Sequence, residues 1–454
     1  MKKICFIILT LTLGACADDL NIKPQASLDS SIALSSDANV KKALLGAYDG
    51  LSGYNANLAA PQFGSLWGGD SFLFSELLAA DGEISWVGTF NQPREVYGKK
   101  MLTNNSFIRN MWTGAYYTIN ICNNILESID NVVEDDRDRV KGEALFIRGA
   151  VYLELVRFFG KPYSAGNLTS NLGVPIVLKS TQKVDASALV SRASVDAVYQ
   201  QILADLTLAE TLLPEENEVY ATKSAAAAIL SRAYLGMGEY ALARDAADRV
   251  IESGLFELTS TYEEAFNNDV NSTEDIFAMQ VNEQDGNNNM QLYWSIQIYG
   301  GRDGDVSIND KHLDLYEAGD ERFDLFYEGN GAIRSGKWKF QFKIVPVVRL
   351  AEMYLTRAEC NFRLGTAVGD TPTNDINLIR DRAGLDPIVP DLDDILLERK
   401  LELAHEGSAV HDMKRLKGSA DGFAYDANAM VFPIPVREIN ANKNLEQNPG
   451  YSDN

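Results

Sequence analysis

The stretch at residues 224–254, SAAAAILSRAYLGMGEYALARDAADRVIESG, constrains the fold more than any other part of the chain. Apolar residues recur at helical spacing on both sides of a Gly-Met-Gly join, which predicts two short amphipathic helices. Alanines stand where the helices must approach closely, and Gly254 is placed to end the second helix. Because one helix pair cannot cover its own apolar faces, further pairs are expected elsewhere in the chain.

The join and the alternation of small and large residues resemble a tetratricopeptide unit. Residues 140–160 and 348–365 carry a weaker first-helix pattern, although neither is followed by a clear second helix of the same type. Periodicity and end signals predict more helices at residues 36–54, 107–129, 194–213, 374–383 and 395–406. The predicted fold is mostly α, a tetratricopeptide-like helical-repeat scaffold with long irregular, partly β insertions.

Helical periodicity is lost at residues 53–105 and 259–345, where glycine, asparagine, aspartate and aromatic residues are dense. The first stretch reads as loop, and short strand-like runs occur at residues 176–178, 291–299 and 338–342. Long irregular insertions in a compact protein are usually functional. We therefore expect the ligand site in these insertions.

The N-terminus predicts a lipoprotein. Lys2 and Lys3 precede an apolar run that is too short to span a bilayer and ends in Leu-Gly-Ala before Cys16. Residues 1–15 are predicted to be a signal peptide, and Cys16 is predicted to carry the lipid that anchors the protein to a membrane. Cys122 and Cys360 lie in helical apolar patterns, where buried free thiols are expected.

The composition weighs against several classes of function. With 41 basic and 64 acidic residues the net charge is −23, so nucleic acid is a poor partner. His405 and His411 are six residues apart and could not bind one zinc ion from one helix face. A nucleophile elbow, a phosphate loop and a dinucleotide fingerprint are all missing from the sequence, so an enzyme has no positive support.

No cofactor is expected, with one weak exception. Four residues partly match a calcium loop, although Ile308 stands where that loop needs glycine: Asp303, Asp305, Ser307 and Asp314. A solvated Asp-Gly turn is the alternative interpretation of this segment.

Aromatic residues of the insertions are the best ligand-binding candidates, because flat rings stack on the apolar faces of sugars or on peptide side chains. Polar neighbours would fix the orientation of hydroxyl or amide groups. The alternative is that each ring pins its own loop to the scaffold. The candidate set is Trp67, Trp86, Phe90, Asn91, Tyr293, Trp294, Tyr299, Arg302, Asp303 and Trp338.

Several motifs in order along the chain are similar to those of one family. They are KALLGAY (42–48), YLELVRFFG (152–160), RLAEMYLTRAE (349–359), INLIRDRAG (376–384), ERKLELAHEG (398–407), FPIPVREI (432–439) and QNPGY (447–451), after the signal that ends at Cys16. Together they resemble the SusD/RagB family of nutrient-binding outer-membrane lipoproteins, and the resemblance covers almost the whole chain.

The resemblance implies a cell-surface lipoprotein that hands oligosaccharide to a SusC-like TonB-dependent outer-membrane transporter. Peptide capture of the RagB type is the alternative, and a glycan-cleaving enzyme or a pure interaction scaffold are further ones. The expected organisation is a signal peptide (1–15), a lipidated N-terminus and tether (16–35), an N-terminal helical region with a loop insertion (36–258) and a C-terminal region with the ligand-binding insertion (259–454).

Overall fold

The computed structural model describes residues 33–53, 65–181, 185–284 and 288–452. The predicted signal peptide and Cys16 lie outside the described residues, as does most of the predicted tether. Within these ranges, no helix combines the length and apolar character that a membrane span requires.

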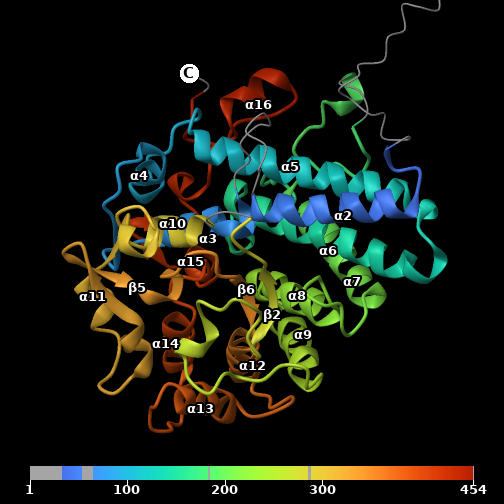
Figure 1. Cartoon of the computed structure of the whole chain (residues 1–454). Helices are drawn as coiled ribbons and strands as arrows, with labels where there is room; N and C mark the ends of the chain where they lie inside the picture. The colour runs from blue at the N-terminus through green and yellow to red at the C-terminus, as the bar shows by residue number, and fades with distance from the viewer. Residues whose placement is uncertain (1–32, 54–64, 182–184, 285–287, 453–454) are drawn as a thin grey trace, which may run out of the picture.

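Nine helices form the scaffold of the described chain, and each packs against the next in the series (Figure 1). The last two both pack on α12. In order, they are α2 (Asp37–Ser52), α5 (Ser106–Glu127), α6 (Glu134–Phe159), α7 (Val195–Leu212), α8 (Lys223–Met237), α9 (Tyr240–Glu252), α12 (Leu350–Leu364), α13 (Pro372–Arg382) and α14 (Leu392–Glu402).

The helix pair predicted at residues 224–254 is confirmed as α8 and α9. Thr222 caps α8, because its side chain accepts the backbone N–H of Ala225 at 3.2 Å. Gly238, with φ of +80°, ends α8 in the left-handed conformation. The alanines at 225–228 and 233 are buried, which lets the neighbouring helices approach closely.

The two weaker first helices also have partners, so the expectation that they lack a second helix is wrong. Arg148 of α6 forms a bidentate ion pair with Asp205 of α7, with N···O distances of 2.8 and 2.7 Å. Arg357 of α12 pairs in the same way with Asp375 of α13, at 3.0 and 2.6 Å. The helix at residues 194–213 was predicted, but its pairing with α6 was not, because an irregular insertion separates α6 from α7.

The strands bring the two predicted insertions together. One antiparallel sheet has the order β1 (Ile84–Trp86), β3 (Val306–Ile308), β5 (Ala332–Ser335) and β4 (Phe326–Gly329), with Ile84 opposite Ile308. β2 (Asp275–Met279) pairs antiparallel with β6 (Val345–Arg349), and β7 (Ser419–Ala420) with β8 (Phe423–Ala424). In Figure 1, β5 lies at the left of the view with α11, and β2 and β6 lie near its centre beside α8.

Short helices occupy parts of the insertions that were expected to be loop or strand. They are α3 (Ser71–Ala79), α4 (Asn91–Tyr97), α10 (Asn289–Trp294) and α11 (Asp310–Leu313), with α15 (Ala409–Arg415) and α16 (Val436–Ala441) nearer the C-terminus. Almost every residue of α3 is buried, so it has no amphipathic stripe to predict it. The runs at 176–178 and 338–342 form no strand. The prediction that Cys122 and Cys360 are buried free thiols is confirmed.

Candidate functional site

Five of the predicted ligand-binding rings are buried in the protein interior. Their exposed fractions are 1% for Trp67, 6% for Trp86, 4% for Tyr293, 0% for Trp294 and 4% for Trp338. A buried ring offers no face to a ligand, so we correct the expectation for these five. Their segments have no regular apolar stripe, and burying a ring is what attaches such a segment to the scaffold.

Hydrogen bonds of the indole groups show this attachment. Trp67 donates its Nε1–H to Glu154 Oε1 of α6 at 3.1 Å. Trp338 donates to the backbone oxygen of His405 at 2.9 Å. The Trp86 indole donates to the oxygen of Phe90 at 3.1 Å. Each of these rings therefore fixes a loop.

Phe90 and Arg302 form a small surface group of their own. The Arg302 guanidinium lies 4.0 Å from the centroid of the half-buried Phe90 ring, and its Nε donates to Asp305 at 2.8 Å. Asn91 and Asp303 are exposed beside them. Because Arg302 already covers one face of the ring, this group is a secondary candidate.

The calcium candidates do not form a metal site in the described chain. The carboxylate of Asp305 binds Arg302, and Ser307 lies inside β3 opposite Ser85. Asp314 follows α11, and Asp303 is exposed. Among the described residues, no group of three or more histidine, cysteine, aspartate or glutamate side chains could hold a metal ion. The geometry gives no support for calcium here.

The seventh predicted ring, Tyr299, lies at an open surface hollow of about 790 Å³, which we call the Tyr299 hollow. Three segments that are distant in sequence meet there. Its lining residues are Glu263, Phe266, Asn267, Gln297, Ile298, Tyr299, Gly300, Phe340, Gln341 and Lys343. A hollow of this volume is in the range of small-ligand sites.

Apolar groups are unusually exposed at the Tyr299 hollow. Ile298 is 79% exposed and Phe340 is 43% exposed. The rings of Phe340 and Tyr299 are 5.5 Å apart and nearly perpendicular, at 84°. This arrangement leaves aromatic and aliphatic surface available to a ligand.

The same hollow carries polar groups that can hydrogen-bond a ligand. Three of its lining side chains are amides, on Asn267, Gln297 and Gln341. Glu263 is the one carboxylate among the described lining residues, and Lys343 pairs with Asp269 at 2.5 Å. Two carboxylates flank the bond that most glycoside hydrolases cleave, and this lining does not supply the pair.

Asn267 holds the loop that carries Phe340. Its side-chain oxygen accepts the backbone N–H groups of Lys339 and Phe340 at 3.0 and 3.1 Å, and its Nδ2 donates to the oxygen of Gly336 at 2.8 Å. Its own φ of +58° is a conformation that asparagine tolerates better than most residues. The loop position of Phe340 thus depends on one side chain.

Lys339 holds the aromatic rings beside the hollow together. Its ammonium lies 4.7 Å from the ring centroid of Tyr299, 4.9 Å from that of Tyr327 and 5.4 Å from that of Phe340. Cation–π attraction at such distances contributes about 0.5–1 kcal/mol at exposed sites. The three rings are therefore held together before a ligand arrives.

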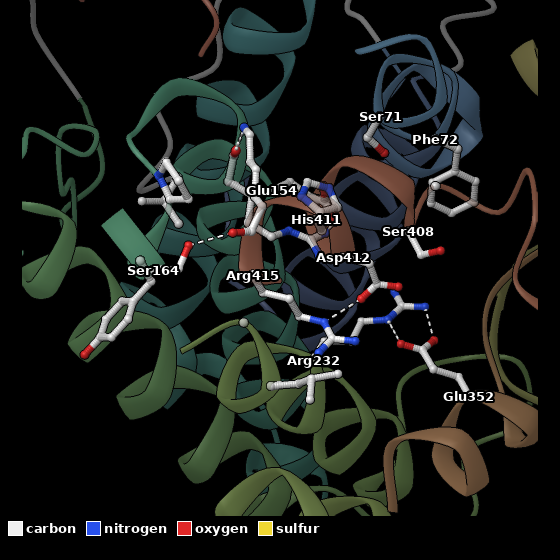
Figure 2. A pocket seen from close by; sticks show the side chains of 18 of the residues that line it. Ser71, Phe72, Glu154, Ser164, Arg232, Glu352, Ser408, His411, Asp412 and Arg415 are labelled. Carbon is white, nitrogen blue, oxygen red and sulfur yellow. Dashed lines mark hydrogen bonds and ion pairs between the residues drawn. The ribbon is translucent and has the colours of Figure 1, made fainter. Parts of the chain in front are cut away.

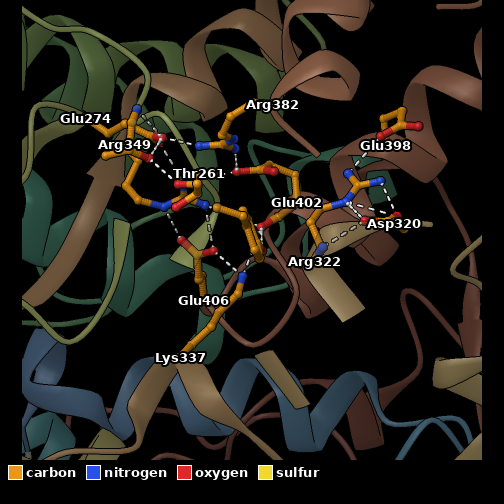
Figure 3. Close-up of polar contacts among 12 residues, drawn as sticks. Thr261, Glu274, Asp320, Arg322, Lys337, Arg349, Arg382, Glu398, Glu402 and Glu406 are labelled. Carbon is orange, nitrogen blue, oxygen red and sulfur yellow. Dashed lines mark hydrogen bonds and ion pairs between the residues drawn. The ribbon is translucent and has the colours of Figure 1, made fainter. Parts of the chain in front are cut away.

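A buried network of charges, shown in Figure 3, reaches Phe266 of the hollow through Arg349. Arg349 binds Glu274 at 2.7 Å, Glu402 at 3.0 Å and Glu406 at 2.8 Å. Arg382 binds the same Glu402 at 2.5 Å. Burial alone would raise the pKa of Glu402, but the charges of Arg382 and Arg349 lower it to about 2. Glu402 therefore stays ionised at neutral pH.

This network also supports the floor of the hollow. Lys337 and Arg349 lie 4.7 and 4.9 Å from the ring centroid of Phe266, which lines the hollow. Lys337 also binds Glu406 at 2.5 Å. Phe266 is consequently fixed to the helical scaffold through the same charges that join β6, α13 and α14.

Sequence reasoning found Tyr299 but missed Phe340, Ile298 and Asn267. Phe340 lies in the alternating run at 338–342, where Trp338 points to the interior and Phe340 is exposed. Strand-like alternation would place Phe340 on the same face as the buried Trp338, so the pattern gave no signal for its exposure. Asn267 carried no signal either, because its role depends on a segment about seventy residues away.

Comparison with protein families matches nearly the whole chain. Residues 20–235 match a SusD-like family described as starch-binding and associating with the outer membrane, and residues 236–431 match the SusD family. A SusD-like protein, P2, from Formosa agariphila is 26% identical over 99% of each chain. The starch-binding protein SusD of Bacteroides thetaiotaomicron is 38% identical over 122 residues, which are 24% of this chain and 21% of that protein.

Solved structures agree with these matches. A SusD superfamily protein from Bacteroides thetaiotaomicron has a TM-score of 0.80 and 26% identity, over 91% of this chain and 100% of that one. A putative sugar-binding protein from Bacteroides vulgatus has a TM-score of 0.79 and 25% identity, over 92% and 100% of the two chains. The helical scaffold and its insertions are thus those of known structures.

Proposed function

Since this chain belongs to the SusD family, we propose that it binds an oligosaccharide at the Tyr299 hollow and releases it unaltered. The observation that carries the proposal is the pair of rings, Tyr299 and Phe340, at an open hollow bounded by three amide side chains. Sugar rings have apolar faces that stack on aromatic rings, and hydroxyl groups that bond to amides. The family's description as starch-binding supports a glycan over other ligands.

We further propose that the protein delivers the glycan to a SusC-like TonB-dependent transporter in the outer membrane. The lipid on Cys16 would hold it at the cell surface beside that transporter. The sequence before Cys16 and the family's description as associating with the outer membrane support this placement. Membrane association by a lipid needs no membrane-spanning helix.

Two features of the hollow bear on the class of ligand. Its exposed Ile298 and Phe340 favour a ligand with apolar faces, and its amides favour neutral polar groups. Peptide capture remains the alternative ligand, because amide side chains also bond to peptide backbone. Cleavage is disfavoured because Glu263 is the single carboxylate among the lining residues that the structure describes.

Calorimetry with a panel of plant, host and microbial oligosaccharides and mixed peptides tests the proposal. Wild type is compared with Tyr299→Ala and Phe340→Ala, and Phe323→Ala is the matched control. Phe323 is 44% exposed, close to the exposure of Phe340, but does not line the hollow. We expect one glycan class to bind, and each hollow variant to weaken binding about 10-fold, since lost stacking costs about 1 kcal/mol or more.

Mass spectrometry of the recovered ligand separates binding from cleavage. The account predicts a ligand of unchanged mass after long incubation. Shortened products would establish an enzyme, and binding of peptides alone would replace the glycan with a peptide ligand. Equal glycan affinity in wild type and both hollow variants would show that the glycan binds outside the Tyr299 hollow.

A further inference from the structure

A second, smaller cavity lies inside the helical scaffold, at the junction of α6, α8, α12 and α15 (Figure 2). Its volume is about 70 Å³, and it shares no lining residue with the Tyr299 hollow. Six arginine or lysine side chains line it: Arg157, Lys161, Arg232, Arg399, Lys414 and Arg415. In a protein of net charge −23, such a concentration of cations calls for a physical explanation.

The four carboxylates of the lining are already bound to other partners. Figure 2 shows some of these contacts, such as the pair of Arg232 and Glu352, with N···O distances of 2.8 and 2.6 Å. The pairs are Glu154 with Arg157, Glu352 with Arg232, Asp412 with Arg399 and Arg415, and Glu406 with Lys337 and Arg349. Among the described residues, these pairs leave Lys414 and Lys161 without an acidic partner.

Lys414 is the deepest of these cations, with 3% of its surface exposed. Its Nζ donates to the backbone oxygen of Arg157, in the last turn of α6, at 3.1 Å. Lys161 donates to the backbone oxygen of Asp426 and to Asn428 Oδ1, the latter at 2.8 Å. Neither lysine is within ion-pair distance of a described carboxylate. An ammonium has three N–H donors, so Lys414 retains bonding capacity.

The surrounding charges act on this region as a positive field. Burial, followed by the charges of Lys161 and Arg157, lowers the pKa of Lys414 to about 7. Burial and then the charges of Arg157, Lys414 and Arg232 hold the pKa of His411 well below its usual range. Arg157 also has a buried Nε that makes no hydrogen bond to the described residues. Buried cations without counter-charges are costly, and an anion would remove that cost.

We propose that this cavity binds a small oxyanion, such as a carboxylate, sulfate or phosphate group, through Lys414 and Lys161. Arg157 borders the same space and contributes to the positive field. The volume has room for about two water molecules, at roughly 30 Å³ each. A space of this size matches one oxyanion group, so the occupant is a free ion or the acidic terminus of a larger molecule.

Calorimetric titration with sodium sulfate, with sodium phosphate and with glucuronate tests the proposal, against sodium chloride at equal ionic strength. We expect saturable binding of at least one oxyanion and none of comparable strength for chloride. Lys414→Met should weaken it about 10- to 100-fold, because a charge-assisted hydrogen bond is lost. Lys100→Met is the matched control, since it removes the same charge from an exposed position and should leave binding unchanged.

The variants also separate anion binding from a purely structural role. Lys414 bonds to the end of α6, so a capping role alone predicts lower stability and unaltered anion titration in Lys414→Met. Lys161→Met, which leaves that bond intact, should also weaken anion binding. Tighter binding of inorganic ions than of glucuronate would indicate that the natural occupant is a free ion. Tighter binding of glucuronate would indicate the acidic terminus of a larger molecule. The absence of saturable oxyanion binding to wild type would overturn the proposal.

Discussion

The side-chain oxygen of Asn267 accepts the backbone N–H of Phe340 at 3.1 Å, which fixes the most exposed ring of the hollow to a segment 73 residues earlier. The same Asn267 also binds the backbone of Lys339 and Gly336. The shape of the Tyr299 hollow therefore rests on one amide side chain as well as on its rings. Preorganisation of this kind lowers the ordering cost of binding.

Asn267→Gly should weaken ligand binding more than it lowers stability. Glycine keeps the positive φ but removes three hydrogen bonds, so the Phe340 loop becomes free to move. We expect about 10-fold weaker binding by calorimetry. Asn330→Gly is the control, because Asn330 has a similar φ of +53° in an exposed turn outside the hollow. Unchanged affinity in Asn267→Gly would show that the loop needs no such support.

Arg349→Met should destabilise the protein strongly. It leaves three buried carboxylates without one of their cations, and breaking a buried ion pair costs about 3–5 kcal/mol. Urea unfolding measures the change. The control is Arg249→Met, which breaks the more exposed pair with Glu210 and should cost about 1 kcal/mol or less. Equal losses in the two variants would contradict the structural role of the buried network.

Glu76 should make stability fall as pH rises from about 4.5 to 7. Burial raises the pKa of Glu76 to about 7 in the folded protein, above its usual value of 4.5. Between these values the folded state holds a proton that the unfolded state has lost, so increasing pH favours unfolding. The effect of this one group is up to about 3 kcal/mol.

The variant Glu76→Gln tests whether Glu76 causes this decline in stability. The amide can still accept the N–H of Gly407, which Glu76 Oε1 accepts at 2.9 Å. Unfolding measured at several pH values should show a smaller decline between pH 4.5 and 7 for Glu76→Gln than for wild type. The exposed Glu328→Gln is the control and should keep the wild-type profile. An unaltered slope in Glu76→Gln would assign the decline to other groups.

Cys16→Ser should abolish lipid attachment. The proposed lipid is attached to the thiol, which serine lacks, so the variant should lose incorporation of radiolabelled palmitate and leave the membrane fraction. Cys122→Ser serves as the control, because the thiol of Cys122 is buried in α5. Continued labelling of Cys16→Ser would refute the anchor at this residue.

The sequence predicted the helices that are long and carry an apolar stripe on one face. α5 and α9 have clear apolar stripes, and their bounds differ from the predicted ones by at most two residues. α3 was missed because it is apolar nearly all round and buries Glu76 as well. Amphipathic periodicity indicates a helix that has one face in solvent and one face in the core. A fully buried helix has no solvent-exposed face, so its sequence shows no such periodicity.

The site was less predictable than the fold. A tryptophan in a glycine-rich segment has the same local sequence pattern whether it binds a ligand or packs its own loop against the scaffold. Trp294, for example, is fully buried. Tyr299 and Phe340 become neighbours only through tertiary contacts. The bond from Asn267 to the Phe340 loop likewise has no local sequence signature.

The most direct test is a crystal structure of the protein soaked with the oligosaccharide that calorimetry identifies. The account predicts a sugar ring within about 4 Å of Tyr299 or Phe340, with hydroxyl groups bonded to Asn267, Gln297 or Gln341. Sugar bound only at the Phe90 and Arg302 surface, or at any other place that leaves the Tyr299 hollow unused, would contradict it.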